Sequence, residues 1–285
     1  MNTSTKLVLI TAALLSTPAW SKSECRGNWS IDVDRSNTQY KSDLSAYIPV
    51  YLQMSSDVQQ CRFPVSFVYV NNKQKSHLRA FNHQLNLTVL DRNFHQLNYR
   101  QNKGFQLNLE RGAVTKFWLK VNQAKMASSG LYNGILELSM RLGDDEQSKK
   151  AKVQLDVPAF VAFRSSGNNP MLKSKGHSSY RFSLGNLQSN KTYRADFDLL
   201  SNSNVRLVIK QKYGELRLHS EQKIAIPYKL DFNHKPVNTK STFQFENSGN
   251  IKKWGIPMEV SLGNIDFARA GSYRDTITVE VKALP

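Results

Sequence analysis

The sequence lacks most of the motifs on which catalysis or metal binding would depend. Its only cysteines are Cys25 and Cys61, so there is no CxxC redox motif. The six histidines do not have the spacing of metal ligands, and neither a G-x-S-x-G nucleophile motif nor a glycine-rich phosphate loop is present. These absences predict a protein that is not an enzyme and holds no metal or cofactor. Paired catalytic carboxylates leave no sequence motif, so a secreted carbohydrate-active enzyme stays a distant alternative.

Long hydrophobic runs are also missing. No stretch approaches the roughly 18 to 20 apolar residues that a transmembrane helix needs. The longest run, LVLITAALLS, follows a single lysine and is followed by small residues at Ala19 and Ser21. This layout predicts a secretory signal peptide over residues 1–21 and an exported chain that does not span the membrane. Lipidation at Cys25 is not expected, because Glu24 stands where a small residue is required.

Acidic residues are few: 22 Asp and Glu stand against 39 Lys and Arg, which gives a formal net charge of +17. An exported basic chain can contact an anionic cell surface, an acidic polysaccharide or nucleic acid. The basic residues are spread over both halves and alternate with apolar ones, as in VRLVIKQKYGELRL. Solvated strand faces therefore explain most of the charge, and nucleic acid is not an expected partner.

The two cysteines are expected to form a disulfide, because paired cysteines are the rule in exported proteins. Closing the loop of about 36 residues between Cys25 and Cys61 would add roughly 3 to 4 kcal/mol of stability in the chain-entropy model.

The sequence is rich in short segments with a period of two. Examples are IPVYLQM, VSFVYV, KVQLDV and MEVSL, and they are separated by turn sequences such as NN, RG, SNSN and NHKP. Helical periodicity is close to absent. Many short alternating strands between turns predict an all-β protein, and the length fits two tandem immunoglobulin-like β-sandwich domains.

One hairpin recurs in both halves. ASSGLYNGILELSM begins at Ala127, ARAGSYRDTITVEV begins at Ala268, and a constant offset carries Gly130 onto Gly271 without a gap. The join is expected near Pro158, which gives a first domain over 22–157 and a second domain over 158–285.

The two copies differ in the residues that come after them. The first turns at GDDEQ and returns as KKAKVQLDV, whose Val153, Leu155 and Val157 share one face, whereas the second has no returning strand. We therefore expect the second sandwich to lack its last strand. The alternative is that KKAKVQLDV is instead the first strand of the second half. The residues expected to line the resulting groove are Ile277, Val279, Val281 and Phe160.

The second half resembles the spore coat protein U-like domain. The resemblance covers most of residues 178–282 and is sharpest at AGSYRDT (270–276), with support from IPY (226–228). That domain occurs in subunits and tip adhesins of archaic chaperone/usher pili. The resemblance implies a subunit that accepts a strand first from a periplasmic chaperone and then from the adjacent pilus subunit, and that passes through an outer-membrane usher to the cell surface.

A subunit that begins with a whole domain can accept a strand but has none to donate, which is expected of a pilus tip. The sequence thus predicts a tip adhesin or minor tip subunit that mediates surface attachment or biofilm formation. A periplasmic pilus-assembly chaperone is the alternative, because such chaperones also consist of two immunoglobulin-like domains and donate a strand. Candidate contacts to an anionic or hydrophobic surface receptor lie in the first half, although strand core is the commoner role of such aromatics. They are Tyr47, Tyr51, Arg92, Phe94 and Tyr99.

Overall fold

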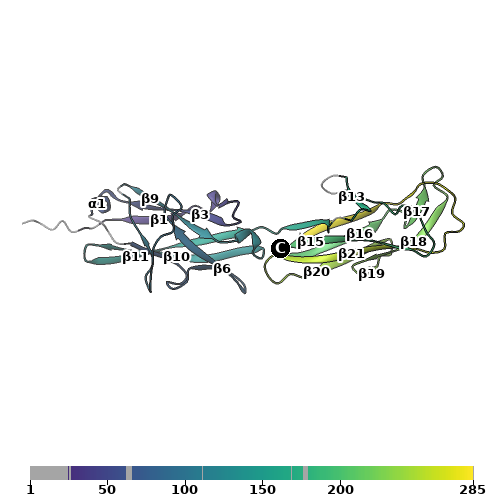
Figure 1. Cartoon of the computed structure of the whole chain (residues 1–285). Helices are drawn as coiled ribbons and strands as arrows, with labels where there is room; N and C mark the ends of the chain where they lie inside the picture. The colour runs from purple at the N-terminus through teal and green to yellow at the C-terminus, as the bar shows by residue number, and fades with distance from the viewer. Residues whose placement is uncertain are drawn as a thin grey trace, which may run out of the picture.

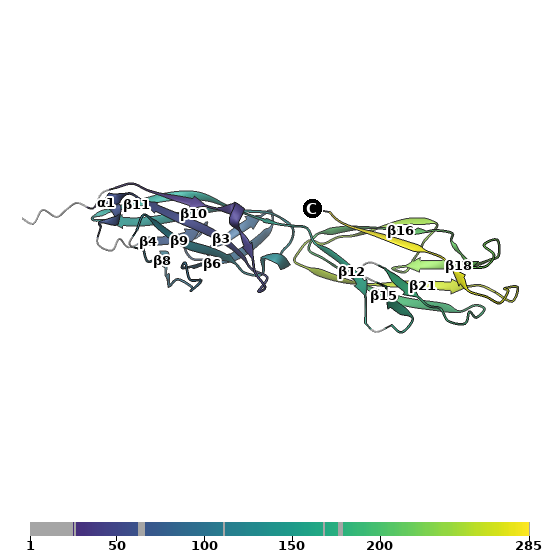
Figure 2. The same cartoon turned by 90° about the horizontal axis from the view of Figure 1, so that it is seen from above.

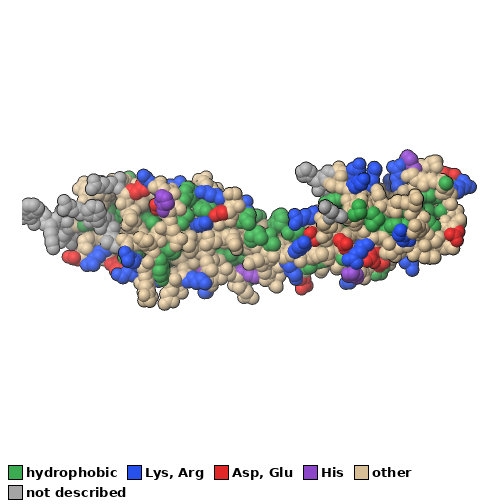
Figure 3. Space-filling view, in the orientation of Figure 1, with side chains coloured by type: hydrophobic (Ala, Val, Ile, Leu, Met, Phe, Trp, Pro, Cys, Tyr) green, Lys and Arg blue, Asp and Glu red, His purple; other side chains and the backbone are tan. Residues whose placement is uncertain are grey.

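The computed structural model describes residues 25, 27–61, 66–110, 112–167, 169–175 and 179–284, so the predicted signal peptide lies outside the described residues. The chain forms two elongated β bodies in tandem, joined at a narrow waist (Figure 1). Lys and Arg are scattered over the visible face of both bodies (Figure 3). Within the described ranges, no helix is long and apolar enough to cross a membrane.

The first half is built from strands and three very short helical turns. Its elements are β1 (Trp29–Val33), η1 (Arg35–Asn37), β2 (Gln39–Tyr40), β3 (Ala46–Met54), α1 (Ser56–Gln59), β4 (Ser66–Val70), β5 (His77–Ala80), β6 (His83–Leu90), β7 (Tyr99–Arg100), β8 (Gly104–Leu107), β9 (Val114–Val121), η2 (Ala124–Met126), β10 (Gly130–Leu142) and β11 (Asp145–Val157).

The second half consists of strands. They are β12 (Val161–Ser165), β13 (Leu172–Ser174), β14 (Tyr180–Phe182), β15 (Thr192–Ser201), β16 (Asn204–Gln211), β17 (Glu215–Leu218), β18 (Ala225–Phe232), β19 (Lys235–Pro236), β20 (Lys240–Phe245), β21 (Lys252–Leu262), β22 (Tyr273–Arg274) and β23 (Ile277–Leu284).

The two halves have the same strand order. In the first, β1-β3-β9-β6-β5 form one layer and β8-β4-β10-β11 the other, with β5 also touching β10. In the second, β12-β15-β21-β18-β17 correspond to the first layer and β20-β16-β23 to the second. All of these pairings are antiparallel, and each half buries its own apolar core. The predicted all-β fold is confirmed, and so is the near absence of helix.

Local backbone geometry supports the repeated hairpin. Gly130 and Gly271, which the offset superposes, both have positive φ, at 141° and 152°. Tyr132 donates its hydroxyl to the carbonyl of Ser128 at 3.1 Å, and Tyr273 donates to the carbonyl of Arg269 at 2.9 Å. Both tyrosines thus bind the backbone four residues upstream, which is the tyrosine-corner device of immunoglobulin-like sandwiches.

Strand β11 completes the first sandwich. It pairs with β10 over its whole length, from Asp145 opposite Leu142 to Val157 opposite Gly130. Its inward-facing residues Val153, Leu155 and Val157 are buried in the first core, as the alternation predicted. The pairing of KKAKVQLDV is therefore with the first half.

Candidate functional site: the open edge of the second sandwich

Strand β23 is paired on one edge only. It runs antiparallel to β16, from Asn204 opposite Leu284 to Gln211 opposite Ile277. Among the described residues, no strand pairs with its other edge. The corresponding edge of β10 in the first half pairs with β11. Figure 2 shows β23 running back toward the junction between the halves, where the C-terminus lies. The backbone N–H and C=O groups along the free edge are available to a further strand.

The missing neighbour leaves the apolar face of β23 incompletely covered. Leu136, Leu138 and Met140 of β10 are fully buried, at 0% exposure. Their counterparts in β23 pack against the second core but are only half-buried, although the alternation directs them inward as predicted. These counterparts are Ile277, Val279 and Val281.

The second wall of the open edge is β12. This strand pairs with β15 on one side and lies near β23 on the other. Its Val161 and Phe163 are also half-buried against the second core, and Phe163 stacks on Phe197 at a centroid distance of 4.9 Å. We call the apolar row formed by Val161, Phe163, Ile277, Val279 and Val281 the acceptor edge.

Phe160 lies beside this row rather than in it. Its side chain is 42% exposed, and its backbone is fixed at the junction, where its N–H donates to the side chain of Asn202 at 2.7 Å. It therefore marks the junction end of the acceptor edge.

The two short motifs on which the family resemblance depends meet at the start of β23. The carboxylate of Asp275, in AGSYRDT, accepts hydrogen bonds from the backbone N–H groups of Tyr213, Gly214 and Thr276. It also accepts the hydroxyl of Tyr228, in IPY, at 2.7 Å. Burial, and then the Asp275 carboxylate, raise the pKa of Tyr228 well above its usual range. This network fixes where β23 begins.

The outward side of β23 is polar. Glu280 forms an ion pair with Lys210 of β16 at 2.6 Å, and both side chains are largely exposed. The Lys210 ammonium lowers the pKa of the Glu280 carboxyl. Because exposed pairs contribute little stability, this outer face offers a control position for tests of the inner one.

A second feature is an aromatic cluster on the outer face of β3 and β9 in the first half. Phe94 stacks on Trp118 at 4.8 Å and meets the edge of Tyr47 at 5.6 Å. Lys41 lies 3.3 Å from the Phe94 ring centre, and Lys116 lies 4.3 Å from that of Trp118. Phe94 is 39% exposed and has a left-handed φ of 67°, which is strained for a bulky residue.

The other residues predicted to contact a receptor differ in their exposure and in their distance from this cluster. Tyr47 is buried, so it supports the cluster from beneath and does not itself face solvent. Tyr51 is half-buried under Lys116, and Arg92 is paired with Glu110 at 3.0 Å. Tyr99 is exposed but contacts Phe105 in the other layer, so it lies outside the cluster.

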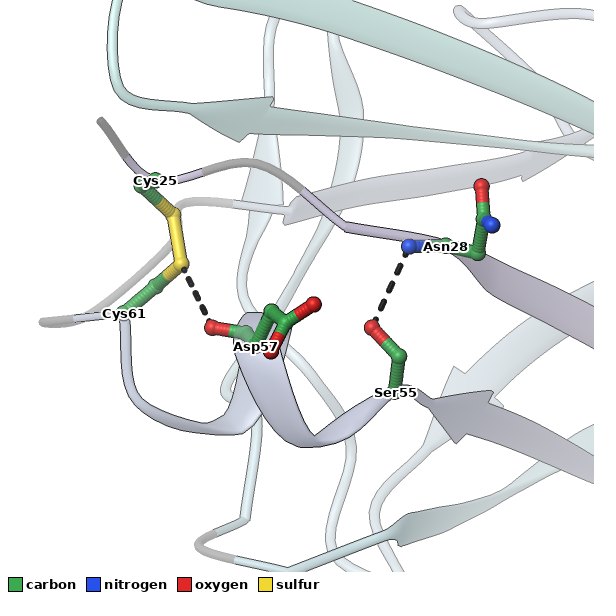
Figure 4. Close-up of a disulfide and its surroundings, with 5 residues drawn as sticks. All are labelled: Cys25, Asn28, Ser55, Asp57 and Cys61. Atoms are coloured by element: carbon green, nitrogen blue, oxygen red, sulfur yellow. Dashed lines mark hydrogen bonds between the residues drawn. A yellow bond between two sulfur atoms is a disulfide. The ribbon is translucent and has the colours of Figure 1, made fainter. Parts of the chain in front are cut away.

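The predicted disulfide is present. Cys25 and Cys61 are bonded, with their Cα atoms 5.5 Å apart (Figure 4). The bond ties the segment before β1 to Cys61, two residues after the end of α1. Nearby, the Ser55 hydroxyl accepts a hydrogen bond from the backbone N–H of Asn28 at 3.2 Å. The N-terminal edge of the first sandwich is therefore held covalently.

No protein-family model matches the sequence, and no curated protein matches it significantly. Similar solved structures include a chain of the chaperone–tip adhesion subunit complex of archaic Csu pili of Acinetobacter baumannii. It is 12% identical, with a TM-score of 0.42, and the match covers 81% of this chain and 89% of that one.

Two further similar structures are fimbrial adhesins. The CFA/I adhesin of enterotoxigenic Escherichia coli is 10% identical, with a TM-score of 0.37, over 92% of this chain and 83% of that one. The CupB6 tip adhesin of Pseudomonas aeruginosa is 10% identical, with a TM-score of 0.30, over 90% and 93%. Values this low carry no weight for function, which has to be judged from the chain's own geometry.

Proposed function

We propose that this chain is a subunit of a chaperone/usher pilus and that its second half accepts a donor strand from another protein. The observation that supports this is the acceptor edge, because β23 has a free backbone edge and a half-covered apolar face. The equivalent β10 is paired on both edges, and Leu136, Leu138 and Met140 on its inner face are fully buried. The resemblance of residues 178–282 to the spore coat protein U-like domain favours the same function.

An open edge beside an apolar row is unfavourable in isolation and prone to aggregation. An added strand pairs the free backbone groups through hydrogen bonds, and its alternate side chains cover the apolar row. Each aliphatic side chain that becomes fully buried contributes roughly 1.5 to 3 kcal/mol. A periplasmic chaperone and then an adjacent subunit are the donors that a pilus would provide, with an outer-membrane usher exporting the assembled chain.

We place the subunit at or near the pilus tip, as an adhesin that attaches the cell to surfaces or supports biofilm formation. The first half is completed by its own β11 and has no equivalent opening in its described residues, so it is free to meet a receptor. Its lysine-flanked aromatic cluster, with the strained and exposed Phe94, is the surface that we assign to a hydrophobic or anionic receptor.

The alternative function, a pilus-assembly chaperone that donates KKAKVQLDV, has less support. A donor strand needs apolar side chains that are free to enter a partner. Val153, Leu155 and Val157 are instead buried in the chain's own core.

Co-purification with the cognate chaperone tests the proposal. Val279→Asp places an unpaired charge in the acceptor edge and should abolish capture, whereas Glu280→Gln, its outward-facing neighbour on β23, should retain it. The unmodified chain expressed without a chaperone should aggregate or be degraded. Equal capture of the two variants, or a stable monomer without any partner, would refute strand acceptance.

A further inference from the structure

A hollow in the first half lies where β10 changes partners. Strand β4 pairs with β10 from Leu136 onward, and β5 takes over at Asn133 opposite Arg79. Asn71, in the loop between β4 and β5, bridges this seam. Its side chain accepts the backbone N–H of Ile135 at 2.8 Å and donates to the backbone carbonyl of His77 at 2.9 Å. The seam is therefore a fixed structure.

The hollow has a volume of about 480 Å³. Small-ligand sites commonly fall in the range of about 300 to 1,000 Å³. No acidic residue lines it, although two basic ones do. The lining residues are Asn71, Asn72, His77, Arg79, Asn133, Gly134, Ile135 and Lys152.

Two cations face this space without counterions. Arg79 and Lys152 are exposed, and neither forms an ion pair or side-chain hydrogen bond with any residue that the structure describes. Lys150, the next outward-facing lysine on β11, is by contrast paired with Glu137 at 3.4 Å. The hollow thus gathers positive charge that the protein itself does not neutralise.

His77 supplies a buried polar group at the same place. The ring is only 4% exposed, and its Nδ1 donates to the carbonyl of Lys75 at 2.8 Å. Its Nε2 has no hydrogen-bond partner among the described residues. The alternation of β5 directs His77 and Arg79 to the outer face, whereas Leu78 and Ala80 enter the core. Buried nitrogens without a partner are rare in folded proteins, so the His77 ring is an unusual polar group beside the hollow.

We propose that this hollow binds a carboxylate-bearing saccharide. The planar guanidinium of Arg79 is suited to grip a carboxylate with two parallel hydrogen bonds, and the Lys152 ammonium adds a second positive charge. Ile135, which is 45% exposed, offers an apolar surface to the C–H face of a sugar ring.

This inference rests on the proposed function and deepens it, since it gives the adhesin a saccharide site in addition to the aromatic cluster. It remains physically separate from strand acceptance, because the hollow lies on the first half and the acceptor edge on the second.

Calorimetric titration of the exported chain, held in its chaperone complex, with digalacturonate tests the site. The dimethyl ester of the same disaccharide keeps the rings and hydroxyls but lacks the charges, so it should bind at least about tenfold more weakly. Arg79→Gln should reduce the affinity for digalacturonate by about 10- to 100-fold, as expected for a lost charge-assisted hydrogen bond. Lys152→Gln should reduce it by about three- to tenfold, because a single exposed charge contributes less.

Arg141→Gln is the matched control. Arg141 is an exposed residue of β10 without an ion pair in the described part of the chain, so its loss removes the same charge away from the hollow. It should leave the affinity within about twofold. The ring signals of His77, followed by NMR, should shift with digalacturonate in the unmodified chain.

Three results would overturn the inference: no binding at about 10 mM digalacturonate, equal binding of the ester or of acetate, or equal weakening by Arg141→Gln. Capture by the chaperone distinguishes a wrong saccharide site from a wrong proposal of strand acceptance. Arg79→Gln should be captured normally, whereas Val279→Asp should not be. If capture depends on Val279 but no acidic saccharide binds, only the saccharide site in the hollow is wrong.

Discussion

A single carboxylate links β15, whose inner face lies in the second core, to β12, which is one wall of the acceptor edge. Asp198 of β15 lies opposite Arg164 of β12 and forms an ion pair with Lys253 of β21 at 2.9 Å. Its side chain is only 10% exposed. The Lys253 ammonium lowers the pKa of the Asp198 carboxyl, and a hydrogen bond to Ser166, just after β12, acts in the same direction. Asp198 thereby holds together three strands, one of which is β12.

Asp198 should make the second half sensitive to acid. Because its folded-state pKa lies below the ordinary value of 3.8, its contribution is complete above that pH and is lost as the pH falls through the folded-state pKa. We expect Asp198→Asn to reduce the free energy of unfolding of the second half by about 1 to 2 kcal/mol at pH 7. The difference from the unmodified chain should shrink below about pH 4. Urea unfolding of the chaperone complex at pH 7 and pH 3, with hydrogen exchange of β12 and β15 as the local readout, measures this difference in stability.

The control for this prediction is Asp231→Asn. Asp231 lies on β18 of the same sheet, which pairs with β21, and it has no ion pair among the described residues, so its replacement should cost less stability at pH 7. A difference between Asp198→Asn and the unmodified chain that stays constant from pH 7 to pH 3 would show that the carboxylate charge is not what stabilises this region.

At the scale of the element, β10 and β23 are the same strand in two different surroundings. Strand β10 has β11 on one edge and is fully buried on its inner face, whereas β23 keeps a half-covered inner face. The difference lies in the neighbour, since both strands alternate apolar and polar residues in the same way. A supplied neighbour should therefore change the behaviour of the second half.

A grafted strand tests this directly. The variant replaces Leu284 and Pro285 by Gly-Asp, the turn that joins β10 to β11, and continues with a copy of residues 145–157. This places the copy of β11 in the register that it has against β10. We expect a stable monomer that no longer needs a chaperone, with roughly 1.5 to 3 kcal/mol gained per apolar side chain that becomes buried. Sedimentation analysis and thermal unfolding measure the two effects.

The matched control for the graft carries serine at the copied positions of Val153, Leu155 and Val157. It retains the backbone hydrogen bonds but loses the apolar contacts, so it should stabilise much less. If the two grafts stabilise equally, or neither does so, the inner face of β23 is not what the open edge lacks.

Sequence alternation predicted the strands, the repeated hairpin and the missing partner of β23, because each of these depends on a local period or on an offset along the chain. Alternation could not predict the burial of Tyr47, whose side chain is covered although it lies outside the main core of the first half. The reason is that Phe94, in the loop between β6 and β7, and Trp118 of β9 cover that outer face, and both lie far from β3 in the sequence. The hollow beside His77 was missed for a similar reason, since it forms where three separate strands meet. Nothing local in the sequence marks such a place.

At the scale of the whole molecule, the junction between the halves is organised by one asparagine. Asn202, in the turn SNSN, is 1% exposed. Its side chain donates to the carbonyls of Ala127 and Pro158, at 3.0 and 3.1 Å, and accepts the backbone N–H of Phe160. Its own carbonyl accepts the N–H of Ser129 at 3.0 Å. The sequence suggested only a turn here, but the side chain binds both halves at once.

A rigid junction matters for the proposed function, because a tip adhesin has to hold its receptor surface at a fixed angle to the subunit that supplies the donor strand. Asn202→Ala removes three hydrogen bonds and leaves the buried carbonyl of Ala127 and the partly buried carbonyl of Pro158 without this donor. We expect both sandwiches to remain folded while the angle between them becomes variable. Three hydrogen bonds between the halves survive this change, from Ile251 to Met126, from Ser128 to Gly249 and from Ser129 to the residue 202 carbonyl, and we expect them to be too few to fix the angle.

Small-angle X-ray scattering of the chaperone complex should then give a broader distribution of interatomic distances for Asn202→Ala than for the unmodified chain, at unchanged circular dichroism. Asn98→Ala is the control, because the side chain of Asn98 is exposed and binds no described residue. Identical scattering curves for Asn202→Ala and Asn98→Ala would mean that the apolar surface visible at the waist in Figure 3, and not the asparagine, sets the angle between the halves.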